Sequence, residues 1–373
     1  MIINFLIIIQ VNMKITYFIR DITDCGGIQQ TTCHGINSII RKSENYDIST
    51  ISLYHKNEEC FFSLDLKVKK YALFNRNIDT KKQYFQIKNR LKVLLEQVKP
   101  DIIVIQGTAF ANYISRSIWN RYKIIVCEHG HYHMGGKFGL HWFGKNKSLK
   151  YANAIVTLTE LDALNYKSNN KKGIVIKKIY NPCVFQKNFQ SNYKLNSKVI
   201  VSCGTLNKVK RFDHVIATAE KVFAKHTDWC WYIYGDGSEK SDLEKMIRER
   251  QLESNVFIKG YETDKNVIYG DKSFMVLTSN FEGFGMVLIE AMQYHLPIIS
   301  YDVNYGPKEI VEDGINGFLV ESGNIELLSN AVERMIEDTD KRQIMSKMAY
   351  QSLDRFDNEQ ITKQWIDLFE MFQ

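Results

Sequence analysis

The sequence has few of the residues that break regular structure or cross-link a chain. It contains 4 prolines among 373 residues, with no low-complexity tract and no internal repeat. These absences argue against a disordered chain and against a solenoid. The seven cysteines are odd in number and scattered, and no CxxC pair occurs. They predict reduced thiols in a cytoplasmic protein rather than a disulfide framework.

Long hydrophobic runs are also lacking. The most apolar stretch is the N-terminal MIINFLIIIQVNM. It is shorter than the ~20 residues that a membrane span needs. It also lacks the basic flank and the small-residue cleavage site of a signal peptide. Because the following MKITYFI is typical of a first strand, we expect Met13 to be the true start. A short membrane-contacting prefix is the alternative.

The composition is that of a globular protein, with 45% hydrophobic and 24% charged residues. The length suits two domains of roughly 150–200 residues each. The net charge of +7 is unevenly distributed. Residues 1–185 carry 27 lysines and arginines against 13 acidic residues, whereas residues 186–373 carry 22 against 29. A basic half can bind nucleic acid or an anionic membrane, and a solvated surface is the plain alternative.

Short apolar runs alternate with amphipathic stretches along the whole chain. Runs typical of buried strands lie at 14–19, 46–53, 101–106, 123–127, 154–158, 198–203, 230–234, 256–259, 274–278 and 297–300. Helical spacing or helix-like composition occurs at 28–41, 80–99, 213–226, 286–294 and 358–372. The alternation predicts an α/β fold of two domains, each with a parallel sheet covered by helices on both faces. The polar stretch 181–197 marks the join.

The segment Thr278–Val320 carries the most specific pattern. Glu282 and Glu290 flank a glycine-containing turn that follows a strand and precedes a helix. Free N–H groups at a helix start attract a diphosphate, and glycine allows its close approach. Glu282 can then reach a sugar. Glu290 lies about 7.5 Å from Gly285 along the helix axis, which suits ribose hydroxyls. An ordinary loop and helix with two surface glutamates is the alternative.

The strings EGFGMVLIEAM, LPIIS, YGPKEI and DGINGFLV resemble glycosyltransferase family 4, within the glycosyl transferases group 1. The resemblance is strong over residues 199–320 and weaker over almost the whole chain. It implies the GT-B fold, an α/β architecture of two Rossmann-like domains facing across a cleft. We expect an acceptor-binding domain at 1–182, a nucleotide-sugar domain at 183–356, and a C-terminal helix at 357–373 that packs back on the first domain.

A second motif departs from the family pattern. The family reads G-R-L-x-x-x-K-G, and its arginine and lysine clamp the diphosphate. Here Lys210 matches the lysine, Thr205 stands in place of the arginine, and Arg211 stands in place of the second glycine. The resemblance therefore implies that Lys208 or Arg211 supplies the missing charge, or that phosphate binding is weaker. A merely solvated loop lysine is the alternative for Lys210.

The first half supplies two further candidates. Gly26-Gly27 follows the first strand, and His129 ends another, where α/β domains place ligands. A simple turn explains the glycines equally well, and the H-x-H-x-H spacing from His129 allows a zinc site. The resemblance implies the catalytic residues Glu282, His129 and Lys210. It implies donor binding by Gly26, Gly27, Gly204, Thr205, Lys210, Arg211, Gly283, Phe284, Gly285, Met286, Val287 and Glu290.

The family retains anomeric configuration and needs no metal, so no cofactor is expected. The literal D-x-D at Asp338-Thr339-Asp340 lies in a charged turn and reads as surface. The resemblance implies transfer of a hexose or N-acetylhexosamine from a nucleotide diphosphate sugar, UDP favoured over GDP. The acceptor is a lipid-linked or growing saccharide of capsule, O-antigen or lipopolysaccharide.

We expect the protein at the inner face of the cytoplasmic membrane, peripherally bound through the basic first domain. The segment Gly136–Tyr151 mixes aromatic residues with lysines, which suits an anionic interface. The rival functions are a non-catalytic GT-B partner subunit and a nucleotide-sugar epimerase. Nucleic-acid binding is disfavoured because no RNA- or DNA-binding motif is present.

Overall fold

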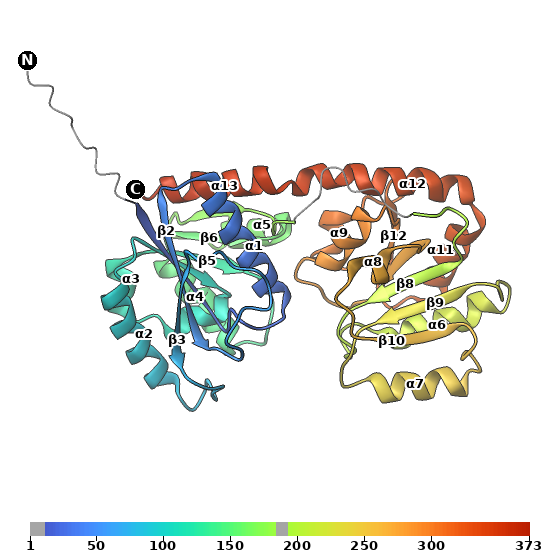
Figure 1. Ribbon diagram of the computed structural model, residues 1–373, viewed down its shortest axis with the longest axis horizontal. Coiled ribbons are helices and arrows are strands. Elements are labelled where there is room, and N and C mark those ends of the chain that lie inside the picture. The colour runs from blue at the N-terminus through green and yellow to red at the C-terminus, as the bar shows by residue number, and fades with distance from the viewer. Residues whose placement is uncertain (1–11, 184–192) are drawn as a thin grey trace, which may run out of the picture. The chain divides into compact units, whose positions relative to one another are not determined.

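The computed structural model describes residues 12–183 and 193–373, which form two compact units (Figure 1). The first unit runs to residue 184 and also takes in residues 358–373, and the second comprises residues 185–357. The apolar N-terminal prefix lies outside the described residues, and so does most of the predicted join at 181–197. In the described ranges, no helix combines the length and the apolar character needed to cross a lipid bilayer.

The first unit contains a seven-stranded parallel sheet in the order β3-β2-β1-β4-β5-β6-β7. Its central strand β4 is buried at every position, as expected for a sheet covered on both faces. The strands are β1 (Met13–Ile19), β2 (Tyr46–Tyr54), β3 (Lys69–Phe74), β4 (Ile102–Gln106), β5 (Lys123–Glu128), β6 (Ala154–Thr157) and β7 (Val175–Lys178).

The helices of the first unit include the last helix of the chain. They are α1 (Gly27–Lys42), α2 (Tyr84–Val98), the 3-10 helix η1 (Thr108–Tyr113), α3 (Arg116–Arg121), α4 (Leu140–Tyr151), α5 (Glu160–Ser168) and α13 (Asn358–Glu370). The C-terminal α13 packs against α1, where the Asn358 amide donates to Ser38 Oγ at 2.9 Å. The Phe369 ring lies edge-on to Tyr46 of β2. Residues 358–373 thus complete the core of the first unit.

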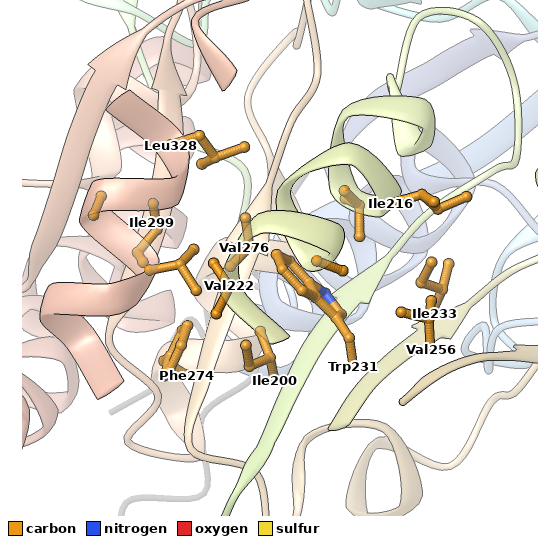
Figure 2. Packing of buried hydrophobic residues seen from close by; sticks show 14 of the residues in the cluster. Ile200, Ile216, Val222, Trp231, Ile233, Val256, Phe274, Val276, Ile299 and Leu328 are labelled. Carbon is orange, nitrogen blue, oxygen red and sulfur yellow. The ribbon is translucent and has the colours of Figure 1, made fainter. Parts of the chain in front are cut away.

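The second unit contains a six-stranded parallel sheet in the order β10-β9-β8-β11-β12-β13. The strands are β8 (Val199–Cys203), β9 (Cys230–Tyr234), β10 (Val256–Gly260), β11 (Phe274–Leu277), β12 (Ile298–Asp302) and β13 (Gly317–Glu321). Figure 2 shows Trp231 among aliphatic side chains of the strands and of α6. Its indole N–H donates to Ser202 Oγ at 3.0 Å, so the buried ring leaves no unpaired donor.

Helices flank this second sheet, and two of them begin beside the motifs singled out in the sequence. They are α6 (Phe212–Phe223), α7 (Lys240–Glu249), α8 (Lys265–Tyr269), α9 (Met286–Gln293), α10 (Pro307–Ile310), α11 (Ile325–Glu337), α12 (Thr339–Gln351) and the 3-10 helix η2 (Ser352–Phe356). Helix α6 follows the Lys210 motif and α9 follows the glycine turn. Asp338 caps α12 by accepting from the Lys341 amide at 2.9 Å, which gives the D-x-D a structural role.

The prediction of two parallel α/β domains is confirmed, with local errors. The helix predicted at 80–99 begins only at Tyr84, because Asp79 accepts from the Lys81 amide in a preceding turn. Strands β3, β7 and β13 were not predicted. All three are edge strands of their sheets and have exposed or half-exposed positions, so none is buried at every position as a central strand is.

Candidate functional site

The glycine turn before α9 lies between the end of β11 and the start of that helix. Gly285 caps the helix with φ +95, a left-handed conformation that favours glycine. The first amides of a helix have no carbonyl partner within it, so the turn offers donors to an anion. Across the turn, Gly306 has φ +79, and a Cβ there would lie 2.6 Å from the Phe284 carbonyl oxygen. Close backbone packing therefore fixes the turn.

Glu282 is a buried carboxylate at the start of this turn. Its Oε1 accepts from Lys210 Nζ at 2.5 Å and from Ser279 Oγ at 2.7 Å. The Glu282 side chain is 10% exposed and the Lys210 side chain 20% exposed, so the ion pair is shielded but reachable. The structure therefore joins two motifs that lie 72 residues apart in the sequence.

The loop that carries Lys210 is pinned to the strand end that leads to Glu282. The Thr278 hydroxyl donates to the carbonyl oxygens of Lys210 at 2.8 Å and Arg211 at 3.0 Å. The Asn280 amide donates to the Val209 carbonyl at 2.9 Å. Gly204 has φ +149, and a Cβ there would approach the Lys210 side chain to 3.5 Å. Gly204, Lys210 and Glu282 thus form one cluster.

Arg211 is directed elsewhere. Its guanidinium donates to the Asp213 carboxylate at 2.9–3.2 Å and contacts His214, which in turn bonds the Tyr301 hydroxyl. Its backbone is left-handed, with φ +50, which explains why the family pattern has glycine at this position. Thr205 and Lys208 are exposed. Of the two cations expected to replace the family arginine, Arg211 is engaged with Asp213 and Lys208 is exposed.

Glu290 projects from α9 and is also a buried carboxylate. Its Oε2 accepts from Lys265 Nζ at 2.7 Å and from the Tyr269 hydroxyl at 3.0 Å. Both partners come from the short helix α8. Phe284 is buried and packs edge-on to Phe356, whereas Gly283, Met286 and Val287 are half-buried. The second unit therefore gathers the amides of the turn, Lys210 and both glutamates.

His129 and the glycine pair belong to the first unit. His129 Nε2 lies 2.5 Å from Gln106 Oε1 at the ends of neighbouring strands β5 and β4. Burial lowers the pKa of His129 to about 4, although Glu128 opposes the shift, so the ring is neutral near pH 7. The side chain lines a pocket of this unit with Thr32 and Trp365. The Thr32 hydroxyl has no hydrogen-bond partner among the described residues.

Gly26 and Gly27 begin α1, and neither has a positive φ. A Cβ at Gly27 would meet nothing within 4 Å, so the packing of this unit does not require glycine there. At the end of β5, Glu128 accepts from Thr108 at 2.8 Å and Tyr166 at 2.7 Å, and it pairs with His141. This buried network holds the end of β5, next to His129.

Sequence reasoning missed several of these contacts. Ser279, Lys265, Tyr269 and Glu128 were not among the candidates, although Glu128 stands beside His129 in the chain. Tyr269 is fully buried and reads as an ordinary core residue. Across residues 12–183 and 193–373, no group of three or more His, Cys, Asp or Glu side chains is arranged to hold a metal ion.

Comparison with known proteins bears directly on this site. The family described as glycosyl transferases group 1 matches residues 184–352, which include both glutamates and Lys210. An uncharacterized glycosyltransferase of Haemophilus influenzae is 30% identical over 343 residues, spanning 90% of this chain and 95% of that protein. The poly(ribitol-phosphate) alpha-N-acetylglucosaminyltransferase of Staphylococcus aureus is 30% identical over 296 residues. That match spans 75% of this chain and 57% of the longer staphylococcal protein.

Solved structures agree on the fold. Staphylococcus aureus TarM in complex with fondaparinux, alpha-GlcNAc-glycerol and UDP superposes with a TM-score of 0.77 at 17% identity. The match covers 96% of this chain and 99% of that one. The lipopolysaccharide outer core galactosyltransferase WaaB gives a TM-score of 0.74 at 19% identity, over 96% and 100% of the chains. The chain is therefore a GT-B glycosyltransferase and belongs to the glycosyl transferases group 1 family.

Proposed function

We propose that this enzyme transfers a hexose or N-acetylhexosamine from a UDP-sugar to a lipid-linked or growing saccharide of a bacterial surface polysaccharide. The observation that carries the proposal is the shielded Lys210–Glu282 pair beside the amides of the turn before α9. The name of the staphylococcal relative, an N-acetylglucosaminyltransferase that acts on poly(ribitol phosphate), supports the sugar and polymer class. TarM was solved with UDP, which favours that nucleotide.

The proposed reaction retains anomeric configuration and needs no metal. The bond between the sugar C1 and the diphosphate oxygen breaks, and an acceptor hydroxyl attacks C1 from the same face. The hydroxyl proton passes to the departing phosphate oxygen. Lys210 and the positive end of α9 stabilise the negative charge that develops on the diphosphate. Glu282, freed from Lys210 as that lysine turns to the phosphate, accepts a hydrogen bond from a sugar hydroxyl.

A panel of UDP-, GDP- and ADP-sugars tests the proposal, with binding and slow hydrolysis measured in EDTA. We expect one UDP-sugar to bind, and Glu290→Ala to weaken binding by about tenfold or more, because it loses a charge-assisted hydrogen bond to ribose. Lack of binding to every donor would favour a non-catalytic partner subunit. Conversion of the nucleotide-sugar with no acceptor present and no release of the nucleotide diphosphate would indicate an epimerase. Strict dependence on Mn²⁺ would reject the metal-independent mechanism.

We further propose that the first unit binds an anionic membrane through one face, built from α2, η1 and α4. The Tyr84 hydroxyl and Lys147 Nζ both donate to the Asn112 carbonyl, at 3.0 and 3.3 Å, so α2 and α4 meet there. Around this point large apolar side chains are exposed: Phe85, Phe138, Leu140 and Phe143. Residues 129–151 hold four lysines and no acidic residue. Exposed aromatic rings among lysines suit a lipid interface.

Vesicle sedimentation tests this surface. We expect binding to phosphatidylglycerol vesicles to exceed binding to phosphatidylcholine vesicles, and the pair Phe138→Ser and Phe143→Ser to weaken it by about tenfold, because buried apolar area is lost. Ile344→Ser is the matched control, since this exposed side chain lies on the second unit. Equal binding of all variants, with loss only at high salt, would instead indicate attraction to any polyanion.

A further inference from the structure

The carboxylate of Glu290 is held from one side. In the described parts of the chain, the donors that reach it are Lys265 Nζ and the Tyr269 hydroxyl, and both contact Oε2. The Glu290 side chain is 9% exposed, and Oε1 is not among the fully buried polar atoms that lack a hydrogen-bond partner. Oε2 is therefore anchored within the protein, while Oε1 remains for a donor that comes from outside.

The anchor extends to the end of a central strand. The Cys203 thiol lies 3.2 Å from the Tyr269 hydroxyl. Tyr269 has a single O–H, which it donates to Glu290, so the thiol donates to the phenol oxygen. Burial raises the pKa of Cys203 to about 12 and that of Tyr269 well above its usual value, which keeps both protons in place. Cys203 directly precedes Gly204 of the Lys210 cluster.

Glu282 is held in the same manner. Its Oε1 accepts from one lysine, Lys210, and from one hydroxyl, that of Ser279. In the described residues each glutamate thus has one oxygen fixed by an ammonium group and a hydroxyl. Ion pairs formed by chance would have no reason to share this arrangement. The arrangement suits two carboxylates that each present one oxygen to a ligand. Fixing the other oxygen orients the carboxylate in advance, which reduces the entropy lost on binding.

We infer that Lys265 and Tyr269 are positioning residues for the nucleoside end of the donor. They fix Oε2 of Glu290 so that Oε1 accepts from the ribose hydroxyls, and they thereby set the preference for ribonucleotides over deoxyribonucleotides. The inference rests on the proposed function, in which Glu290 contacts the ribose. Neither residue belongs to the motifs that identified the family, since they lie 25 and 21 residues before Glu290.

The lysine also has an electrostatic role. The donor brings a negatively charged diphosphate into the site that already holds the carboxylates Glu282 and Glu290. Like charges in a shielded site repel more strongly than in water. Lys265 compensates Glu290 as Lys210 compensates Glu282. When Lys210 turns to the phosphate, Lys265 remains with its carboxylate, because the ribose hydroxyls are neutral and do not compete for the ammonium.

Calorimetric titration with UDP, 2′-deoxy-UDP and 3′-deoxy-UDP tests the inference on the full chain. We expect the wild type to prefer UDP over at least one deoxy analogue by about 10–100-fold, the range for a hydrogen bond to a charged group. Lys265→Met and Tyr269→Phe should each reduce this preference by about fivefold or more. Lys265→Arg should restore it, because a guanidinium can donate to the same oxygen.

The matched control is Lys221→Met, which breaks a lysine–glutamate pair of 2.8 Å with Glu326 on the surface of the same unit. It should leave the preference unchanged. A purely structural role for Lys265 and Tyr269 would lower the affinities for UDP and deoxy-UDP equally. An unchanged ratio of these affinities in both variants would overturn the inference and leave the proposed function standing. If the wild type binds no UDP, GDP or ADP, the proposed function fails together with it.

Discussion

Replacing Lys210 by methionine should lower donor turnover by about 10²–10³-fold, the usual cost of removing one charged stabiliser of a developing anion. Lys210 lies 2.5 Å from Glu282 and is 20% exposed in its side chain, so it is shielded from water yet able to reach a ligand. The loss should fall mainly on kcat, because the diphosphate gains charge as the glycosidic bond breaks. The measurement is the hydrolysis or transfer rate of the donor that binds in the sugar panel.

Lys208→Met is the matched control for the effect on kcat. Lys208 stands two residues away in the same loop and is exposed. If it supplies the charge of the absent family arginine, its loss should raise KM by about tenfold and leave kcat near the wild-type value. An unchanged rate in Lys210→Met would contradict the proposed role of Lys210. Lys210→Met removes a cation and also leaves the Glu282 carboxylate unpaired. Adding Glu282→Gln to the Lys210→Met variant removes that carboxylate charge and so separates the two effects.

The candidate site residues were predicted from local motifs, whereas their partners from distant parts of the chain were not predicted. The glycine turn and Glu282 follow the end of β11, Lys210 follows the end of β8, and Glu290 lies on the helix that the turn begins. Their signals are therefore local to strand ends and the helices after them, where α/β folds place ligands. The partners Lys265 and Tyr269 come from a different helix, and no spacing rule links α8 to α9. A buried tyrosine in an apolar run reads as core, so its hydrogen bond to Glu290 had no visible signal.

The position of Arg211 shows a second limit. The sequence offered it as a replacement for the missing arginine, because charge is visible in a sequence and side-chain direction is not. In the folded chain its left-handed backbone and its pairing with Asp213 direct the guanidinium into a separate cluster with His214. The same limit applies to strands. Central β4 is buried throughout and was predicted, whereas outer β3 and β7 expose several positions and were not.

Gly306→Ala should weaken donor binding by at least about tenfold through backbone packing alone. Gly306 precedes α10 with φ +79 and ψ −85, a conformation open to glycine and strongly strained for other residues. A Cβ there would lie 2.6 Å from the Phe284 carbonyl oxygen and 3.1 Å from Glu282 Cβ. Neither neighbour is the flexible end of a side chain. The turn before α9 must therefore move, and Glu282 with it.

Gly314→Ala is the control that separates the steric clash expected at position 306 from the backbone strain of a positive φ. Gly314 also has a positive φ, +76, but a Cβ there would meet nothing within 4 Å. We expect Gly314→Ala to lower the free energy of unfolding by about 1–2 kcal/mol and to leave donor affinity unchanged. Gly306→Ala should cost about 3 kcal/mol or more in urea unfolding and weaken UDP binding by at least about tenfold. Equal effects of the two substitutions on UDP affinity would show that the close contact between residue 306 and the turn does not shape the site.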